Sequence, residues 1–234
     1  MQLAVVFVSY LKVPRERLQD HFVWNHEAYA QFGNRLRVYV VTDTPHDVPP
    51  YAECVLYPME ALPLVGGRRR FSPAKTRNAG LRKAIEDGAD VLVCTDVDIA
   101  FTPQTLALMS TVPDDFAGIP LCRMAPSFED RHGGHIDHGC TGTVAMTAAN
   151  WRRLPYDERC VGYGQDDGLL FWDIERAGIT VMRDHEVSHI AHVEGDVHRT
   201  PGSGAATCWG REDGFNFENS RSNWRLYRKR RPRP

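Results

Sequence analysis

Val91-Leu-Val-Cys-Thr-Asp-Val-Asp98 is the stretch of sequence that decides the fold. Its first five residues are uncharged and mostly aliphatic or β-branched, which is typical of a strand buried on both faces of a sheet. Asp96 and Asp98 follow at its carboxyl end, where ligands bind in open α/β sheets. Residues two apart on extended backbone point the same way, so these carboxylates can hold a hard divalent cation and, through it, a diphosphate. Because neighbouring acids repel, we expect a positive counter-charge beside them.

Similar short apolar runs recur along the chain and alternate with helical patterns. Further strands are predicted at residues 3–8, 36–42, 116–121, 143–146 and 179–182. Helices are predicted at residues 14–32, 73–87 and 166–177, and another begins at Thr102-Pro103. Ser72 before Pro73 is a favourable helix start, and Gly88 is a favourable stop. The alternation predicts an α/β fold, Rossmann-like, with a mostly parallel central sheet and helices on both faces.

The length and composition fit one folded domain. A chain of 234 residues can bury a substantial core, and 42% hydrophobic with 25% charged residues excludes a disordered or fibrous protein. The six cysteines are scattered without a close pair, which favours reduced thiols over disulfides or a zinc site. The first apolar run, residues 3–8, is too short for a signal peptide or a membrane span, so we expect a cytoplasmic protein.

The last fourteen residues, 221–234, carry seven basic side chains and no acid. The rest of the chain then has 21 basic and 30 acidic residues, a balance of −9, although the whole chain is only −2. A basic tail of this kind can contact an anionic membrane surface or nucleic acid, which would make the protein peripheral at the membrane in the first case. A solvated, frayed terminus is the alternative.

A second polar segment is Gly162-Tyr-Gly-Gln-Asp-Asp-Gly-Leu-Leu170, which leads into an amphipathic helix. Its glycines allow the backbone to approach a ligand closely. Asp166 and Asp167 fall in the first helical turn, where the helix dipole stabilises carboxylates. The two acids are therefore either functional groups or simple caps of this helix.

Taken together, Phe71-Ser-Pro-Ala-Lys-Thr-Arg-Asn-Ala-Gly80 and residues 91–98 resemble the nucleotide-binding half of GT-A glycosyltransferases, especially family-2-like and bacterial chondroitin-polymerase-type enzymes. The resemblance implies that Asp98 binds the metal and Asp96 binds the metal or the ribose. It assigns residues 1–110 to the nucleotide-binding half and residues 111–220 to the acceptor and catalytic half.

The resemblance also implies which residues surround the nucleotide sugar. They are Ser9, Tyr10, Asp43, Lys75, Arg77, Asn78, Asp96 and Val97. An ordinary basic helix face is the alternative for Lys75 and Arg77, and packing on the core is the alternative for Tyr10. The planar guanidinium of Arg77 can bind either phosphate or the neighbouring carboxylates.

Residues 162–167 resemble the Gly-Trp-Gly-x-Glu-Asp signature of inverting galactosyltransferase-like enzymes. The resemblance implies that Asp167 is the catalytic base and that Asp166, Tyr163 and Gly164 bind the acceptor. Tyr163 stands where the family has Trp, and Asp166 is shorter than the family's Glu. These departures affect the acceptor geometry more than the chemistry.

Histidines follow in two clusters. Some GT-A enzymes complete the metal shell with a histidine downstream of the base, which points to His192, with His189 and His198 as competitors. An imidazole ligand beside carboxylates suits Mn²⁺ better than Mg²⁺. The other cluster, residues 132–143, lacks a convincing zinc pattern and fits a loop near the donor sugar.

The sequence therefore predicts a metal-dependent inverting glycosyltransferase. It would move a hexosyl or N-acetylhexosaminyl group from a nucleotide sugar, with UDP expected from the resemblance, to a hydroxyl of a glycan or lipid-linked glycan. One alternative is a nucleotidyltransferase, which the lack of a Gly-rich loop near the first strand disfavours. The other is a non-catalytic protein that binds nucleic acid or membrane through residues 221–234.

Overall fold

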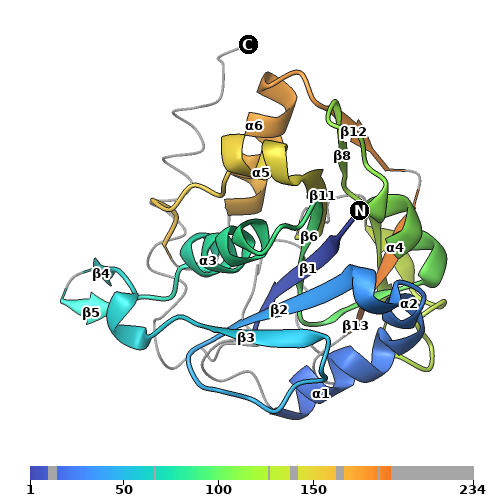
Figure 1. The fold of residues 1–234 in the computed structure, drawn as a ribbon, viewed down its shortest axis with the longest axis horizontal. Coiled ribbons are helices and arrows are strands. Elements are labelled where there is room, and N and C mark those ends of the chain that lie inside the picture. The colour runs from blue at the N-terminus through green and yellow to red at the C-terminus, as the bar shows by residue number, and fades with distance from the viewer. Residues whose placement is uncertain are drawn as a thin grey trace.

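The structure is a computed structural model that describes residues 1–9, 15–65, 67–125, 127–137, 142–161, 166–183 and 185–190. Within these ranges a seven-stranded sheet has the order β12-β8-β11-β6-β1-β2-β3 (Figure 1). Its strands are β1 Leu3–Val8, β2 Leu36–Thr42, β3 Ala52–Leu56, β6 Val91–Asp96, β8 Phe116–Gly118, β11 Val144–Thr147 and β12 Thr180–Met182. β1 runs parallel to β2 and β6, whereas β11 runs antiparallel to β6 and β8. The predicted mostly parallel sheet is confirmed.

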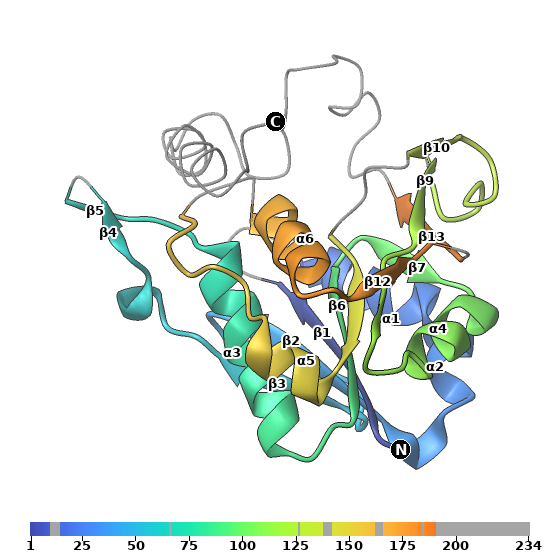
Figure 2. The same ribbon diagram turned by 90° about the horizontal axis from the view of Figure 1, so that it is seen from above.

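Helices cover both faces of this sheet, as predicted (Figure 2). On one face α3 (Pro73–Glu86), α5 (Ala148–Arg153) and α6 (Asp166–Arg176) share an apolar cluster with alternate residues of the strands. On the other face the cluster includes α1 (Arg15–Trp24), α2 (His26–Ala30) and α4 (Pro103–Ser110). Because successive strand residues point to opposite faces, β1 contributes Val6 to the first cluster and Val5 to the second.

Helix α3 is fixed at both ends by local chemistry. The Ser72 hydroxyl accepts a hydrogen bond from the Lys75 N–H at 3.3 Å, and Pro73 occupies the first turn. Gly88 ends the segment with φ of +88°, a conformation that favours glycine. Gly80 lets the helix lie close to the sheet, because a Cβ there would come within 2.5 Å of the Val6 and Val41 side chains.

A second sheet, β10-β9-β13-β7, lies beside the carboxyl end of β6. Its strands are β7 Ile99–Phe101, β9 Leu121–Ala125, β10 His135–Asp137 and β13 Glu186–Ile190. β13 pairs with β7 antiparallel and with β9 parallel, so His189 lies opposite Ile99. The remaining elements are β4 Leu64–Val65, β5 Arg68–Arg69 and the 3₁₀ turns Gly33–Arg35 and Met59–Ala61.

Two predicted elements differ from the structure. The strand predicted at 116–121 is two strands in two sheets, because Pro120 has no N–H to continue the ladder of β8. The helix predicted at 14–32 is divided at Asn25 into α1 and α2.

Two sequence expectations concern the whole domain. Cys54, Cys94, Cys122 and Cys160, the described cysteines, are free thiols. No helix in the described ranges is both long and apolar enough to cross a membrane. Residues 221–234 lie outside the described part of the chain.

Candidate functional site

Arg77 of α3 joins three carboxylates that are far apart in sequence. Its Nη2 donates to Asp96 Oδ1 at 2.5 Å, and its Nη1 donates to Asp166 Oδ2 at 2.9 Å and Asp167 Oδ1 at 2.6 Å. Asp96 ends β6, and the other two acids begin α6. The predicted counter-charge beside Asp96 is confirmed, and the Arg77 guanidinium binds carboxylates as one of its two predicted options. We call these four residues the Arg77 cluster.

The members of the Arg77 cluster differ in their access to solvent. The side chains of Arg77 and Asp166 are only 7% and 4% exposed, whereas Asp167 is 26% and Asp96 is 43% exposed. The Arg77 guanidinium also lies 5.2 Å from the centre of the buried Tyr156 ring. Arg77 is thus held between that ring and the acids, and Asp96 and Asp167 are the members of the cluster that are most open to a bound molecule.

Burial raises the pKa of the Asp167 carboxyl well above its usual value; the Arg77 charge opposes this shift, and the charges of Asp166 and Asp96 add to it. Burial also raises the pKa of Asp166, again against the effect of Arg77. Because one guanidinium cannot neutralise three carboxylates, the repulsion among the acids adds to the larger effect of burial. A carboxylate with a raised pKa is better suited to accept a proton near neutral pH than an ordinary aspartate.

Asp98 has a different partner. β6 ends at Asp96, and Val97 and Asp98 form a turn, so the expectation of extended backbone through Asp98 is wrong. The Asp98 carboxylate, in a residue only 5% exposed, lies 3.0 Å from Nε2 of His189 on β13. Burial lowers the pKa of His189, but the charge of Asp98 and its hydrogen bond outweigh burial and raise that pKa to about 9. Each predicted acid of the motif therefore has its own positive partner.

The residues around the turn suit a divalent cation in kind. Carboxylate oxygens with an imidazole nitrogen are a donor set that Mn²⁺ accepts. Adjacent ligands of a six-coordinate ion with bonds of about 2.1 Å lie roughly 3 Å apart, a spacing that the Asp98–His189 pair matches. Among the described residues no three such side chains are already gathered as a metal site. The predicted ligand His192 and its competitor His198 lie outside the described ranges, whereas the other competitor, His189, is in place.

Other predicted nucleotide-binding residues lie near the same strand ends. The amide of Asn78 is buried and bonded to the backbone of Tyr156, donating to its carbonyl at 2.9 Å and accepting from its N–H at 3.0 Å. The Ser9 N–H donates to the Val41 carbonyl just beyond β1. Val97 packs into the core. For these residues a contact with the donor stays a prediction.

The remaining predicted residues are either partly exposed or undescribed. Lys75 on α3 and Asp43 after β2 are half-buried. Tyr10, Tyr163 and Gly164 lie outside the described residues, so the structure says nothing of them.

Two residues at the site were not singled out from the sequence. Gly142 passes so close to the motif that a Cβ there would lie 2.6 Å from Asp96 Oδ2. Tyr156 lies against Arg77 and is bonded by Asn78. The Gly-rich segment 132–143 contained the signal for Gly142, and the position of this segment near the donor stays a prediction. No local pattern marked Tyr156.

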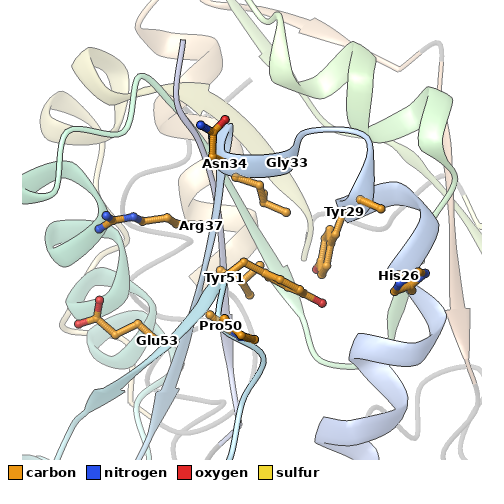
Figure 3. Close-up of a pocket in the computed structure, with 12 residues that line it drawn as sticks. His26, Tyr29, Gly33, Asn34, Arg37, Pro50, Tyr51 and Glu53 are labelled. Carbon is orange, nitrogen blue, oxygen red and sulfur yellow. The ribbon is translucent and has the colours of Figure 1, made fainter.

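A pocket of about 690 Å³ lies elsewhere, between α2, the turn Gly33–Arg35 and the amino-terminal ends of β2 and β3. Figure 3 shows Tyr29 and Tyr51 on its wall, and their ring centres are 6.1 Å apart. Of the predicted site residues that the structure describes, none lines it. Those described residues therefore lie apart from this pocket.

No protein-family model and no curated protein matches the sequence. Solved structures do match. The catalytic domain of Drosophila β1,4-galactosyltransferase 7, in complex with xylobiose, has a TM-score of 0.58 at 16% identity, covering 100% of this chain and 82% of that one. The mannosyltransferase PcManGT from Pyrobaculum calidifontis, in complex with GDP-Man and Mn²⁺, has a TM-score of 0.54 at 16% identity, covering 87% of this chain and 58% of that one.

Residues 1–349 of S. aureus TarS have a TM-score of 0.55 at 12% identity, covering 81% of this chain and 60% of that one. This chain thus spans less than two thirds of both PcManGT and TarS. This chain therefore has the GT-A fold that these glycosyltransferases share.

Proposed function

We propose that this chain is a metal-dependent inverting glycosyltransferase that moves a sugar from a nucleotide sugar to a hydroxyl group of an acceptor. One observation carries the proposal: Arg77 bonds the acid at the end of β6 to the two acids that begin α6. In a GT-A fold this brings the predicted donor-binding acid next to the predicted base, and it leaves Asp96 and Asp167 accessible.

The donor side of the proposed site is the turn that holds Asp96 and Asp98. These two carboxylates would bind Mn²⁺ together with His189 or His192. A divalent ion bound there supplies positive charge to the diphosphate leaving group. Solved structures of similar fold contain GDP-Man with Mn²⁺, UDP, and UDP-GlcNAc, which supports a nucleotide-sugar donor. We propose a UDP-sugar, from the sequence resemblance.

The acceptor side is the first turn of α6. Asp167 is the accessible acid there, and burial raises the pKa of its carboxyl, as a general base near neutral pH requires. Asp167 would take the proton of the acceptor hydroxyl while that oxygen forms a bond to the anomeric carbon. The bond from this carbon to the diphosphate oxygen breaks in the same step, and a nucleoside diphosphate leaves. A single displacement of this kind inverts the anomeric configuration.

A panel of UDP- and GDP-sugars with Mn²⁺, read by release of nucleoside diphosphate, tests the proposal. Asp98→Ala should lose metal-dependent nucleotide binding, whereas Asp167→Asn should keep binding and lose transfer. Glu175→Gln, an exposed acid on the same helix, is the matched control and should keep both. Proton magnetic resonance of the product reads the anomeric configuration, and a retained configuration would refute the single displacement.

The sequence left two alternatives, and the same panel distinguishes them. A nucleotidyltransferase would release pyrophosphate from a nucleoside triphosphate and a sugar phosphate. A non-catalytic protein acting through residues 221–234 would release neither product and would bind DNA or anionic vesicles with a steep salt dependence.

We propose a glycan or lipid-linked glycan as the acceptor, with the basic tail holding the enzyme near an anionic surface.

A further inference from the structure

A side chain of α1 forms a hydrogen bond with the backbone of the turn that carries Asp98. His21 of this helix is fully buried, and its Nδ1 lies 2.9 Å from the carbonyl oxygen of Val97. Its Nε2 lies 2.8 Å from the hydroxyl of Tyr29, which belongs to α2 and is also buried. His21 thus connects a tyrosine on a neighbouring helix to the peptide group between the two motif acids.

The hydrogen-bond partners of His21 determine which of its two ring nitrogens carries a hydrogen. A carbonyl oxygen can only accept, so Nδ1 of His21 carries the hydrogen and donates it to Val97. In a neutral imidazole Nε2 then has the free lone pair, and the Tyr29 hydroxyl donates to it. The hydrogen bonds therefore run in one direction, from Tyr29 through His21 to the Val97 carbonyl.

Asn25, one helical turn after His21, binds the strand that leaves the motif. Its side-chain N–H donates to the Ile99 carbonyl at 2.9 Å, and its side-chain oxygen accepts from the Phe101 N–H at 2.8 Å. Together His21 and Asn25 hold backbone groups at positions 97, 99 and 101 from one side. The backbone that carries Asp98 is thereby held by side chains of α1, α2 and the residue between them, and these two helices contribute none of the predicted site residues.

Packing alone does not explain a histidine at position 21. Its ring packs against apolar side chains as well, with the ring centre of Phe7 at 4.0 Å and that of Phe22 at 5.8 Å. Placing an imidazole in such surroundings is unfavourable unless both nitrogens are bonded, and a phenylalanine would fill the same space without that requirement. What the imidazole adds is a directed bond to the Val97 carbonyl.

We propose that His21, supported by Tyr29, is a positioning residue that sets the Asp96–Asp98 turn for binding of the metal and the donor diphosphate. The inference rests on the proposed function, because it assigns a purpose to the orientation of the turn. It predicts that weakening the His21–Val97 bond weakens donor and metal binding more than it changes acceptor binding.

Matched substitutions of His21 separate positioning from packing. His21→Asn places an amide N–H where Nδ1 was and keeps the bond to Val97, whereas His21→Gln keeps a polar group where Nε2 was and loses that bond. Mn²⁺-dependent binding of UDP and GDP to the full chain is measured by calorimetry. We expect His21→Gln and His21→Phe to raise Kd about tenfold or more, and His21→Asn to stay within about threefold of wild type.

Two further measurements make the test independent of activity and of general destabilisation. Hydrogen–deuterium exchange of the peptide covering residues 96–101 should rise in His21→Phe and stay near wild type in His21→Asn. Phe22→Leu, which removes packing next to His21 from the same apolar cluster, should lower the melting temperature without raising that local exchange.

The outcomes distinguish the two proposals. Equal losses of donor binding in His21→Asn, His21→Gln and His21→Phe would overturn the positioning role, and so would a loss that simply follows melting temperature through Phe22→Leu. A wild-type chain that binds no nucleotide with Mn²⁺ and releases none from any nucleotide sugar would instead overturn the proposed function.

Discussion

Replacing Arg77 by methionine tests the central feature of the candidate site. The change removes one positive charge from among three carboxylates and leaves a shorter, unbranched apolar side chain that replaces the aliphatic part of Arg77. Asp166, with 4% of its side chain exposed, and Asp167, with 26%, then lose their common partner. Asp96, at 43% exposed, can be solvated instead and should contribute little.

The magnitude follows from the burial. Removing one partner of a buried ion pair typically costs about 3–5 kcal/mol, because the other charge stays buried without compensation. The pKa values of Asp166 and Asp167 are already raised, so these groups can escape part of the penalty by binding protons. We therefore expect Arg77→Met to lose about 3 kcal/mol at pH 7, the lower end of the range. For a domain of this size that lowers the melting temperature by roughly 6–12 °C.

Arg82→Met is the matched control on the same helix. The side chains of Arg82 and of its partner Glu158 are 58% and 42% exposed. Ion pairs of this kind contribute about 0–1 kcal/mol. Urea unfolding of both variants at pH 7, with melting followed by circular dichroism, gives the comparison directly.

The pH dependence of this stability loss tests whether ionised, unpaired carboxylates cause it. A carboxyl whose pKa is raised on folding destabilises the native state where it must be ionised, and this penalty disappears once it is protonated in both states. The gap between wild type and Arg77→Met should therefore be largest near neutral pH and close as the pH falls toward about 4, the ordinary pKa of aspartate. Arg77→Met/Asp166→Asn should recover part of the loss at pH 7. The reasoning is refuted if Arg77→Met costs no more than Arg82→Met, or if its cost is the same at both pH values.

Three further changes have separate readouts. Gly142→Ala places a Cβ within 2.6 Å of Asp96 Oδ2 and should weaken Mn²⁺-dependent nucleotide binding at least threefold with a small change in melting temperature; an unchanged Kd would contradict it. Gly80→Ala pushes α3 off the sheet and should cost about 1–3 kcal/mol in urea unfolding with donor binding intact in the folded fraction. Burial lowers the pKa of His21 from 6.5 to about 4. Between these two pH values the unfolded chain binds a proton that the folded chain does not, so about 3 kcal/mol of stability present above pH 6.5 is lost as the pH falls toward 4. His21→Phe should remove this part of the acid sensitivity, and an unchanged slope of stability against pH would show that His21 does not cause it.

The central strands could be predicted from the sequence because their environment is uniform. β1 and β2 begin and end where their apolar runs do, since parallel strands with helices on both faces are unbroken apolar segments. β3 was not predicted, because it is an edge strand of mixed burial and has no such run. The division of the first helix at Asn25 could not be predicted either. Its side chain bonds to Ile99, 74 residues away, and no local pattern encodes that contact.

The candidate site shows the same limit. Residue types and spacing named Asp96 and the acids of α6, because charges at strand and helix ends are visible in a sequence, and the family resemblance added Arg77. The role of Asn78 in the fold is not visible in the sequence, because its side-chain amide bonds to the backbone of Tyr156, 78 residues further on. His21 is a stronger case. In sequence it is one residue of an apolar helix face, and its partner at Val97 lies 76 residues further on.

Asp166 and Asp167 illustrate why adjacent residues of one type need a structure before they receive roles. Both begin α6 and both bond to Nη1 of Arg77, so neither chemistry nor contacts distinguish them. Exposure does, because Asp166 is enclosed whereas about a quarter of the Asp167 side chain is open. A base must touch the hydroxyl whose proton it takes, and of these two acids Asp167 is the more open to such a contact. The difference in exposure therefore favours Asp167 as the base independently of the family signature. The enclosed Asp166 is better placed to hold Arg77.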